Sequence, residues 1–338
     1  MRKYFFPVVI LISLIMLALL AGNSAVRTKD FLGVLSGGGT DGHKMILFQV
    51  RLPRIAAAVF SGAGLSVSGF LLQGSLDNRI ASPGILGINN GAGLFVLLSA
   101  YFFPFQAAMK CLMAFLGALL VTFMAYGLAA KTGMSKTSVV LAGVAVSALC
   151  ASIIDIMISW RPEIVADKTA FQIGGFAAVS AMMVSFGAPV IAFGLLAAFV
   201  TAPSMDILCL GDETAHGLGL NTRRYRGLCV FCSALLAGAA ISMGGLIGFV
   251  GLIVPNCVRS LWRGNARPAV FFCAVYGALL LLLCDTLSRM VVFPYELPCG
   301  LFLSIAGAPF LILTLIRKRK MLYVQSPVEE RAHMLHST

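Results

Sequence analysis

Residues 53–73 read PRIAAAVFSGAGLSVSGFLLQ, a stretch in which Arg54 carries the only charge. A helix of about 20 apolar residues is long enough to cross the hydrocarbon core of a bilayer. Small residues recur four apart, at Gly62 with Ser66 and at Gly64 with Ser68, a spacing that lets helix backbones approach closely. The stretch therefore predicts a membrane-spanning helix that packs tightly against its neighbours.

The composition of the whole chain agrees with this prediction. Hydrophobic residues make up 59% of the 338 positions, charged residues only 11%, and the mean hydropathy is +0.95. Soluble domains carry about a quarter charged residues, so this chain lacks the charge to solvate them. The formal charge of +12 comes from short Lys and Arg clusters, without the aromatic-interleaved basic patches of nucleic-acid-binding proteins. A lipid bilayer is the expected surrounding, and no nucleic-acid partner is expected.

Apolar segments of similar length continue along the chain. Ten candidates run near 4–22, 53–73, 85–103, 111–130, 138–159, 184–202, 227–243, 246–258, 269–290 and 299–316. The eighth is too short to cross alone, and Gly244, Gly245 and Pro255 predict a broken or half-length helix inside the bundle. We therefore expect an all-α polytopic membrane protein with about ten transmembrane helices. Residues 1–320 would form a single transmembrane domain, and residues 321–338 a polar, disordered cytoplasmic tail.

The distribution of basic residues predicts the orientation. With the N-terminus inside, most Lys and Arg residues before the tail fall in cytoplasmic connections, including Arg223, Arg224 and residues 317–320. An even number of spans then places both termini in the cytoplasm and the chain in the cytoplasmic (inner) membrane. Residues 1–25 also fit a cleaved signal peptide, but the rest of the chain is equally apolar, which favours a retained first helix.

The sequence contains no enzyme motif of the kinds sought. A GxxxxGK[ST] phosphate loop, GxSxG and HExxH are all absent. Most of the nine cysteines lie in apolar segments, so we interpret the Cys229–Cys232 CxxC pair as buried membrane residues. His333 and His336 are interpreted as solvated. We expect no catalytic residue, metal or cofactor on this chain, and any ATP that drives it would be bound by another subunit.

Charged residues beside the spans are the main candidate sites. Arg51 and Arg54 flank the predicted outer entrance of the second span, and Asp285 and Arg289 lie one helical turn apart near the outer end of the ninth. Two interpretations stay open: the arginines extend to the interface while Asp285 pairs with Arg289, or they form a basic patch for an acidic partner. The inner connection 203–226, with its polar segment 211–219, is either a solvated loop or a docking site.

Three blocks of sequence carry a family resemblance. The first contains Arg51-Leu52-Pro53-Arg54, Gly62-Ala63-Gly64-Leu65, Ser68-Gly69, Gln73-Gly74, Asn78, Ala81-Ser82-Pro83-Gly84, Leu86-Gly87 and Asn90-Gly91-Ala92. The second is Gly248-Phe249-Val250-Gly251-Leu252-Ile253-Val254-Pro255 with Arg259, and the third contains Asp285, Arg289, Glu296-Leu297-Pro298, Gly300 and Gly307-Ala308-Pro309-Phe310. In this order they resemble the FecCD-type permeases of bacterial importers for iron–siderophores, haem and cobalamin.

The resemblance implies a type II ABC importer permease fold with ten spans. It also implies an assembly with a second permease copy or paralogue, two ATP-binding-cassette ATPase subunits and an extracytoplasmic substrate-binding protein. The site residues that it implies are Arg51, Arg54 and Arg289 for binding-protein docking, Gly211, Asp212, Glu213, Ala215 and Gly219 for ATPase coupling, and Asn78, Ile80, Thr137 and Ser138 near the cytoplasmic gate. The implied activity is import of an iron chelate by alternating access, with a siderophore as the first expectation and haem or cobalamin behind it.

Two positions depart from the family pattern. Arg79 stands where a proline usually follows Asn78, and Asn256 stands where a histidine usually follows Pro255. An ion-gradient-driven secondary transporter is the alternative function, with Asp155 and Asp285 as its acidic candidates. A membrane enzyme or a receptor without transport is disfavoured because no catalytic cluster is found.

Overall fold

The computed structural model of the protein describes residues 2–20, 41–103, 106–132, 135–262, 264–291, 295–310 and 312. Within these residues all regular structure is helical, which confirms the predicted fold class. The predicted polar tail, residues 321–338, lies outside the described part of the chain.

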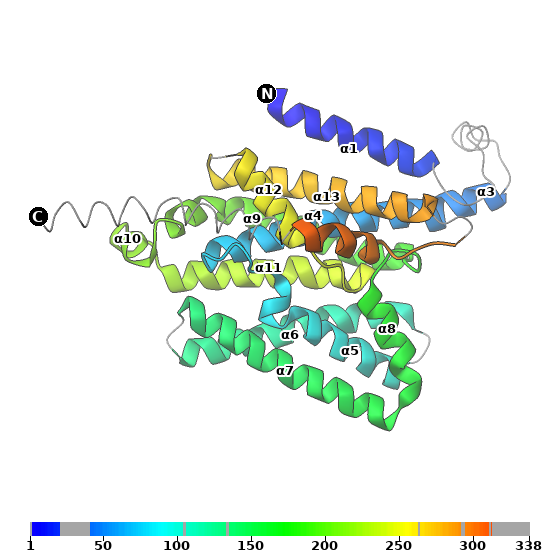
Figure 1. The fold of residues 1–338 in the computed structure, drawn as a ribbon, viewed down its shortest axis with the longest axis horizontal. Coiled ribbons are helices and arrows are strands. Elements are labelled where there is room, and N and C mark those ends of the chain that lie inside the picture. The colour runs from blue at the N-terminus through cyan, green and yellow to red at the C-terminus, as the bar shows by residue number, and fades with distance from the viewer. Residues whose placement is uncertain are drawn as a thin grey trace, which may run out of the picture.

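The helices alternate between long spanning elements and short connections (Figure 1). The first half contains α1 (Arg2–Leu20), α3 (Asp41–Met45), the π-helix η1 (Ile46–Arg51), α4 (Leu52–Ser75), η2 (Pro83–Leu86), α5 (Ile88–Phe102), α6 (Ala107–Lys131) and α7 (Lys136–Trp160). The second half contains η3 (Pro162–Ile164), α8 (Val165–Ile173), α9 (Ala181–Leu208), α10 (Asp212–Gly217), α11 (Thr222–Gly244), α12 (Val250–Leu261), α13 (Ala266–Met290) and a helix over Cys299–Phe310.

Ten of these helices correspond to the ten predicted spans, and the last span, 299–316, is described only for residues 299–310 and 312. Among the described residues, six helices are long and apolar enough to cross a membrane: the run that contains α4, and α6, α7, α9, α11 and α13. Four shorter apolar helices, Tyr4–Leu20, Ile88–Phe102, Val250–Leu261 and Cys299–Phe310, correspond to the remaining predictions. The second span begins earlier than predicted, because α3, η1 and α4 form one continuous helical run from Asp41 to Ser75.

Helix α4 is the centre of the bundle. In its most apolar 18-residue stretch 83% of the residues are buried, against 22% for the peripheral α9. It packs against α13, α11, α9 and α12, so elements that are far apart in sequence meet around it. Figure 1 shows α1 along the outside of α13, at the opposite edge of the bundle from α7.

The small residues of α4 form two distinct contact faces. A methyl group at Gly62 would overlap the main-chain carbonyl of Gly277 in α13, so these backbones touch directly. On the other face, the Ser68 hydroxyl lies 2.6 Å from the hydroxyl of Ser233 in α11 and donates to its carbonyl at 3.0 Å. The spacing of small residues in the sequence therefore predicted real helix contacts, with a separate neighbour for each face.

The connection between α11 and α12 breaks the helix at the predicted glycines. Gly245 has a φ of +69° and Phe249 a φ of +67°, so the chain turns before α12 begins at Val250. Helix α12 has 12 residues, and the Gln73 side chain of α4 donates to its Gly251 carbonyl at 3.0 Å. The half-length helix packed inside the bundle is therefore confirmed.

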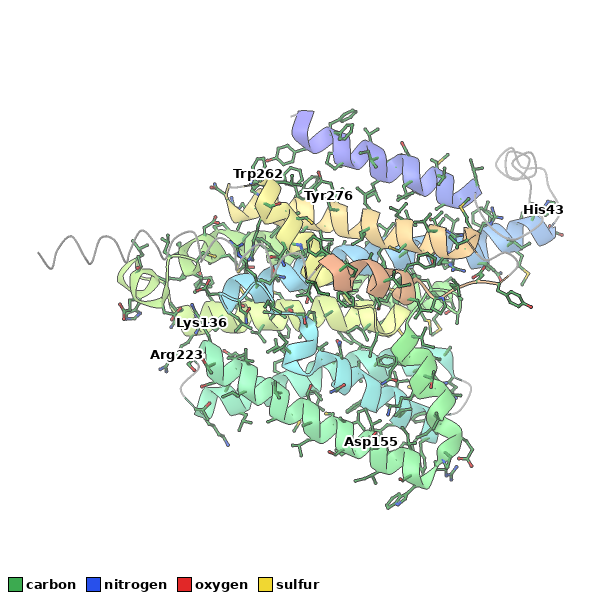
Figure 2. All side chains as sticks on the ribbon, in the orientation of Figure 1. His43, Lys136, Asp155, Arg223, Trp262 and Tyr276 are labelled. Atoms are coloured by element: carbon green, nitrogen blue, oxygen red, sulfur yellow. The ribbon has the colours of Figure 1, made fainter. Side chains whose placement is uncertain are left out.

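The long helices run side by side and define two ends of the bundle. We call them the α10 end and the α8 end, after the short helix at each. Figure 2 shows Lys136 and Arg223 at the α10 end, and His43 and Asp155 at the opposite one. Both short helices lie outside the predicted spans.

Candidate functional site: ion clusters at the two ends of the bundle

An arginine–carboxylate cluster lies at the α8 end. Arg54, in the first turn of α4, donates from Nη2 to Asp285 Oδ1 of α13 at 3.0 Å and from Nε to both Asp285 oxygens at 3.1 Å. Its Nη1 donates to Glu296 Oε2 at 2.6 Å. The side chains of Arg54 and Asp285 are only 9% and 1% exposed, so this is a desolvated, charge-assisted network.

The other two predicted docking arginines lie beside this pair. Arg289 approaches the second oxygen of Asp285 at 3.4 Å, and Arg51 donates from Nη1 to the main-chain carbonyl of Leu19 in α1. Arg51 ends a π-helix, an element that occurs often at functional sites. The structure thus gathers Arg51, Arg54 and Arg289 at one end of the bundle, and all three are buried.

The principal pairings of this cluster were missed by sequence reasoning. The expected Asp285–Arg289 pair is present, but Arg54 holds Asp285 with more and shorter hydrogen bonds. Glu296 was noted only as part of a motif, although it is the one acidic residue between Asp285 and Glu329. A single acidic residue in such an apolar region indicates a paired carboxylate, so the sequence did contain a sign of the role of Glu296.

A cavity of about 260 Å³ adjoins the cluster. Its walls include Arg54 and Glu296, the small residues of the segment after α8, and the segment that precedes the helix Cys299–Phe310. An acidic group entering this cavity would therefore meet a guanidinium that is already shared between two carboxylates.

A second ion pair fastens α10 at the opposite end. Gly211, with φ +102°, and Gly219, with φ +83°, flank α10 in conformations that favour glycine. Asp212 accepts from Arg226 Nη2 at 2.7 and 2.9 Å, and Arg226 Nε donates to the Ser75 carbonyl of α4 at 3.1 Å. Arg226 is therefore a buried link between α10, α11 and α4.

Helix α10 has a buried side and an exposed side. Ala215 is fully buried against Leu208 and Leu220, whereas Glu213 is exposed. On either side of α10, Leu210 is 60% and Leu218 63% exposed. The predicted coupling residues thus lie in and directly beside α10, and the exposed Leu210 and Leu218 flank them.

The four predicted gate residues lie in two neighbouring segments at the α10 end. Asn78 Oδ1 accepts from the Ile80 main-chain amide at 3.0 Å in the turn after α4, and Ser138 and Thr137 open α7. Lys136 pairs with Asp77 at 3.3 Å and joins these two segments.

The two departures from the family pattern are in direct contact. Asn256 Nδ2 donates to the main-chain carbonyl of Arg79 at 3.2 Å and to the Leu252 carbonyl at 2.8 Å. Helix α12 is therefore tied to the turn after α4, beside the predicted gate.

Acidic residues relevant to the alternative function are paired. Asp155 of α7 accepts from Lys168 of α8 at 3.2 Å, and Asp285 is held by the arginines. Across the described ranges, no group of three or more His, Cys, Asp or Glu side chains is arranged to hold a metal ion.

The chain matches known transport proteins over nearly its whole length. A model of the FecCD transport family matches residues 10–317. The Fe(3+)-citrate import system permease protein YfmD of Bacillus subtilis is 36% identical over 306 residues, covering 90% of this chain and 91% of that protein. The hemin transport system permease protein HmuU of Yersinia pestis is 34% identical over 322 residues, covering 92% and 95% respectively.

A solved structure shares the fold. It is described as an inward-facing conformation of a transporter of the metal-chelate ABC type, with a TM-score of 0.81 and 25% sequence identity. The match covers 94% of this chain and 99% of that one.

Proposed function

The chain belongs to the FecCD transport family and is a multi-pass permease of an ABC importer for metal chelates; on that premise we propose how it works and what it carries. The substrate is a metal chelate: we expect an iron complex of a siderophore or of citrate first, and haem or the cobalt complex cobalamin as alternatives. The α8 end faces the outside and the α10 end the cytoplasm, with both termini cytoplasmic and the chain in the inner membrane.

The observation that carries the mechanism is the position of α4 between two ionic sites. Its first turn holds Arg54 in the outer cluster, and its last carbonyl accepts from Arg226, which holds α10. One helix therefore connects the residues proposed for binding-protein docking with those proposed for ATPase coupling. This arrangement supports communication between two partners on opposite sides of the membrane.

Docking at the outer end would use the arginines of the cluster. The cluster contains three arginines, Arg51, Arg54 and Arg289, and two carboxylates, Asp285 and Glu296. A carboxylate on a substrate-binding protein would add an acidic partner to these arginines, and such complementarity chiefly steers encounter and fixes orientation. The adjoining cavity supplies room for that carboxylate.

ATP is bound by two separate ATPase subunits that dock on α10. Leu210 and Leu218 supply exposed apolar contacts, and Glu213 an exposed charge. Closure of the ATPases displaces α10, and two permease subunits move between outward-open and inward-open states. The gate segments around Asn78, Ile80, Thr137 and Ser138 separate or meet in that movement, which is a ligand-biased shift between two states.

The test is ATPase activity and iron-chelate uptake in liposomes that contain the permease, its ATPase and the binding protein. Loaded binding protein is expected to stimulate ATP hydrolysis. Glu213→Ala combined with Leu218→Asn should lower that stimulation severalfold by removing exposed contacts of α10. Ser260→Ala changes an exposed polar residue of α12 and should leave stimulation unchanged.

Two results would contradict the proposal. Uptake that persists without ATP and collapses with the ion gradient would support a secondary transporter. Equal stimulation in the α10 variant and the Ser260 control would remove α10 from the coupling site.

A further inference from the structure

An apolar groove lies between α6 and α11 on the surface of the bundle. It encloses a cavity of about 290 Å³, lined from α6 by Leu119, Thr122, Phe123 and Tyr126, and from α11 by Arg224, Gly227, Leu228, Val230, Phe231 and Ala234. Both helices are apolar enough to span the membrane, and Phe123 is 56% exposed. The groove is therefore open toward the surrounding lipid rather than toward the core.

The shape of the groove depends on one glycine. A methyl group at Gly227 would overlap the hydroxyl of Tyr126, so the two helices meet closely there and separate beyond. The rings of Phe123 and Phe231, which both line the groove, lie in a tilted contact with centroids 5.7 Å apart. Flat aromatic and branched aliphatic walls of this kind suit a flexible hydrocarbon chain.

One end of the groove carries the guanidinium of Arg224. Arg224 lies in the first turn of α11, at the α10 end, and no acidic side chain of the described residues pairs with it. Arg226, two residues later, has Asp212 as its partner. Among the residues that line the groove there is no Asp or Glu, whereas Tyr126 is one of them, and its hydroxyl lies beside Gly227.

The position of Arg224 in the first turn of its helix favours the binding of an anion there. A helix N-terminus carries a partial positive charge, and the first turn of α11 contains arginines and no acidic residue. An anion held by Arg224 would offset both charges. Its attachment to an apolar chain would explain why the cation adjoins a hydrophobic groove.

A second cavity on the same helix provides an internal comparison. It measures about 360 Å³, lies between the other end of α6 and α9, and is lined by Gln106, Ala108, Met109, Cys111, Leu112, Met182, Met183 and Phe186. It is equally apolar but has no charged residue in its lining. Of these two cavities, the groove at the α10 end is the one that combines a hydrocarbon surface with a cation.

We propose that the α6–α11 groove binds one anionic phospholipid, with an acyl chain along the apolar wall and the phosphate on Arg224 and the Tyr126 hydroxyl. Basic pockets between membrane helices recognise anionic head groups in this way. The inference needs only the membrane-embedded fold and stands apart from the docking and coupling proposals.

Native mass spectrometry of the purified full chain in detergent tests it. The probes are dioleoyl-phosphatidylglycerol and dioleoyl-phosphatidylcholine, titrated separately. The unmodified protein should retain one phosphatidylglycerol about fivefold more tightly than phosphatidylcholine, the expectation for one interfacial Arg–phosphate contact. Arg224→Gln should abolish that preference.

Matched variants separate the groove from general charge. Arg223→Gln removes the same charge from the neighbouring position, which does not line the groove, and should keep the preference. Leu119→Trp fills the apolar wall and should weaken retention of both lipids. Leu112→Trp makes the same change in the second cavity and should leave the tight phosphatidylglycerol in place.

Each contrary result overturns the proposal. An unchanged preference in Arg224→Gln, with helicity intact by circular dichroism, would show that Arg224 does not hold the head group. An equal loss in Arg223→Gln would indicate general surface charge. Displacement of the bound lipid by glycerol phosphate alone would show that a free phosphate, rather than a lipid, is the ligand.

Discussion

The two ends of α4 carry arginine–carboxylate pairs that differ in their exposure to water. At the α8 end the Arg54 and Asp285 side chains are 9% and 1% exposed. At the α10 end Arg226 is 3% exposed, but Asp212 is 44% exposed. Both side chains of the pair at the α8 end are shielded from solvent, whereas the pair at the α10 end has one partner in contact with solvent.

This difference separates a structural network from a movable one. Two ions taken out of water must stay paired, because a lone buried charge is strongly destabilising. A carboxylate that is already partly hydrated can exchange its partner for water or for another protein at small cost. We infer that the ion cluster at the α8 end stabilises the packing of the helices. The Asp212–Arg226 pair, in contrast, can break and let α10 move.

The largest loss of stability is expected from removing Asp285, the carboxylate that Arg54 and Arg289 share at the α8 end. Asp285→Ala leaves Arg54 and Arg289 without their common partner and should lower the stability of the bundle by about 3–5 kcal/mol. Thermal unfolding of the purified permease in detergent measures this. Asp155→Ala, which breaks a pair whose carboxylate is 73% exposed, is the control and should cost at most about 1 kcal/mol. Equal losses would contradict the distinction between shielded and solvent-exposed pairs.

The next largest loss of stability is expected at the Asp212–Arg226 pair of the α10 end. Arg226→Lys keeps the charge but cannot hold Asp212 and the Ser75 carbonyl together, so we expect a loss of about 1–3 kcal/mol. Stimulation of ATP hydrolysis by loaded binding protein should fall further than basal hydrolysis, because α10 is no longer fastened to α4. A uniform fall in both rates, matched by lower protein yield, would reduce Arg226 to a purely structural residue.

A smaller effect is expected where α12 meets the turn after α4. Asn256→Ala removes the hydrogen bond to the Arg79 carbonyl and should cost about 0.5–1.5 kcal/mol. Hydrogen exchange of amides in residues 76–82 should accelerate, while amides around Arg54 stay protected. Faster amide exchange around Arg54 as well as in residues 76–82 would show that the two ends of α4 do not open independently.

The smallest change in stability is expected for Glu296→Gln. The carboxylate is 35% exposed, so its pair with Arg54 should contribute about 0.2–1 kcal/mol. The variant makes the outer cluster more positive, so an acidic binding protein should associate faster. Surface plasmon resonance at low and moderate salt measures the rate, and the difference should shrink as salt rises. A slower association would assign Glu296 to attraction of the partner instead.

The sequence predicted the elements that depend on local information. Apolar length identified the spans, Gly244 and Gly245 marked the break before α12, and the Gly62–Ser66 spacing marked a close contact. These features need only neighbouring residues in the chain, because hydropathy and backbone freedom act over a few helical turns. The short helix α8 was not predicted, since it lacks the length of a span.

The pairings within the sites depend on distant residues. Arg54 and Asp285 are 231 positions apart, and Arg226 reaches the Ser75 carbonyl across 151. Motif order gathered the three docking arginines on one side, but it could not say which carboxylate each would meet. Asn256 and Arg79 were both noted as unusual, and only the packing of α12 against the turn after α4 brought them into contact.

The unbroken helical run from Asp41 to Ser75 has a consequence for the membrane itself. Its 35 residues extend roughly 50 Å, whereas the hydrocarbon core of a bilayer is about 30 Å thick. The excess must project beyond the core or be taken up by tilt, and tilt changes with bilayer thickness. The acyl-chain length of the host membrane thus becomes a variable that sets the inclination of the central helix.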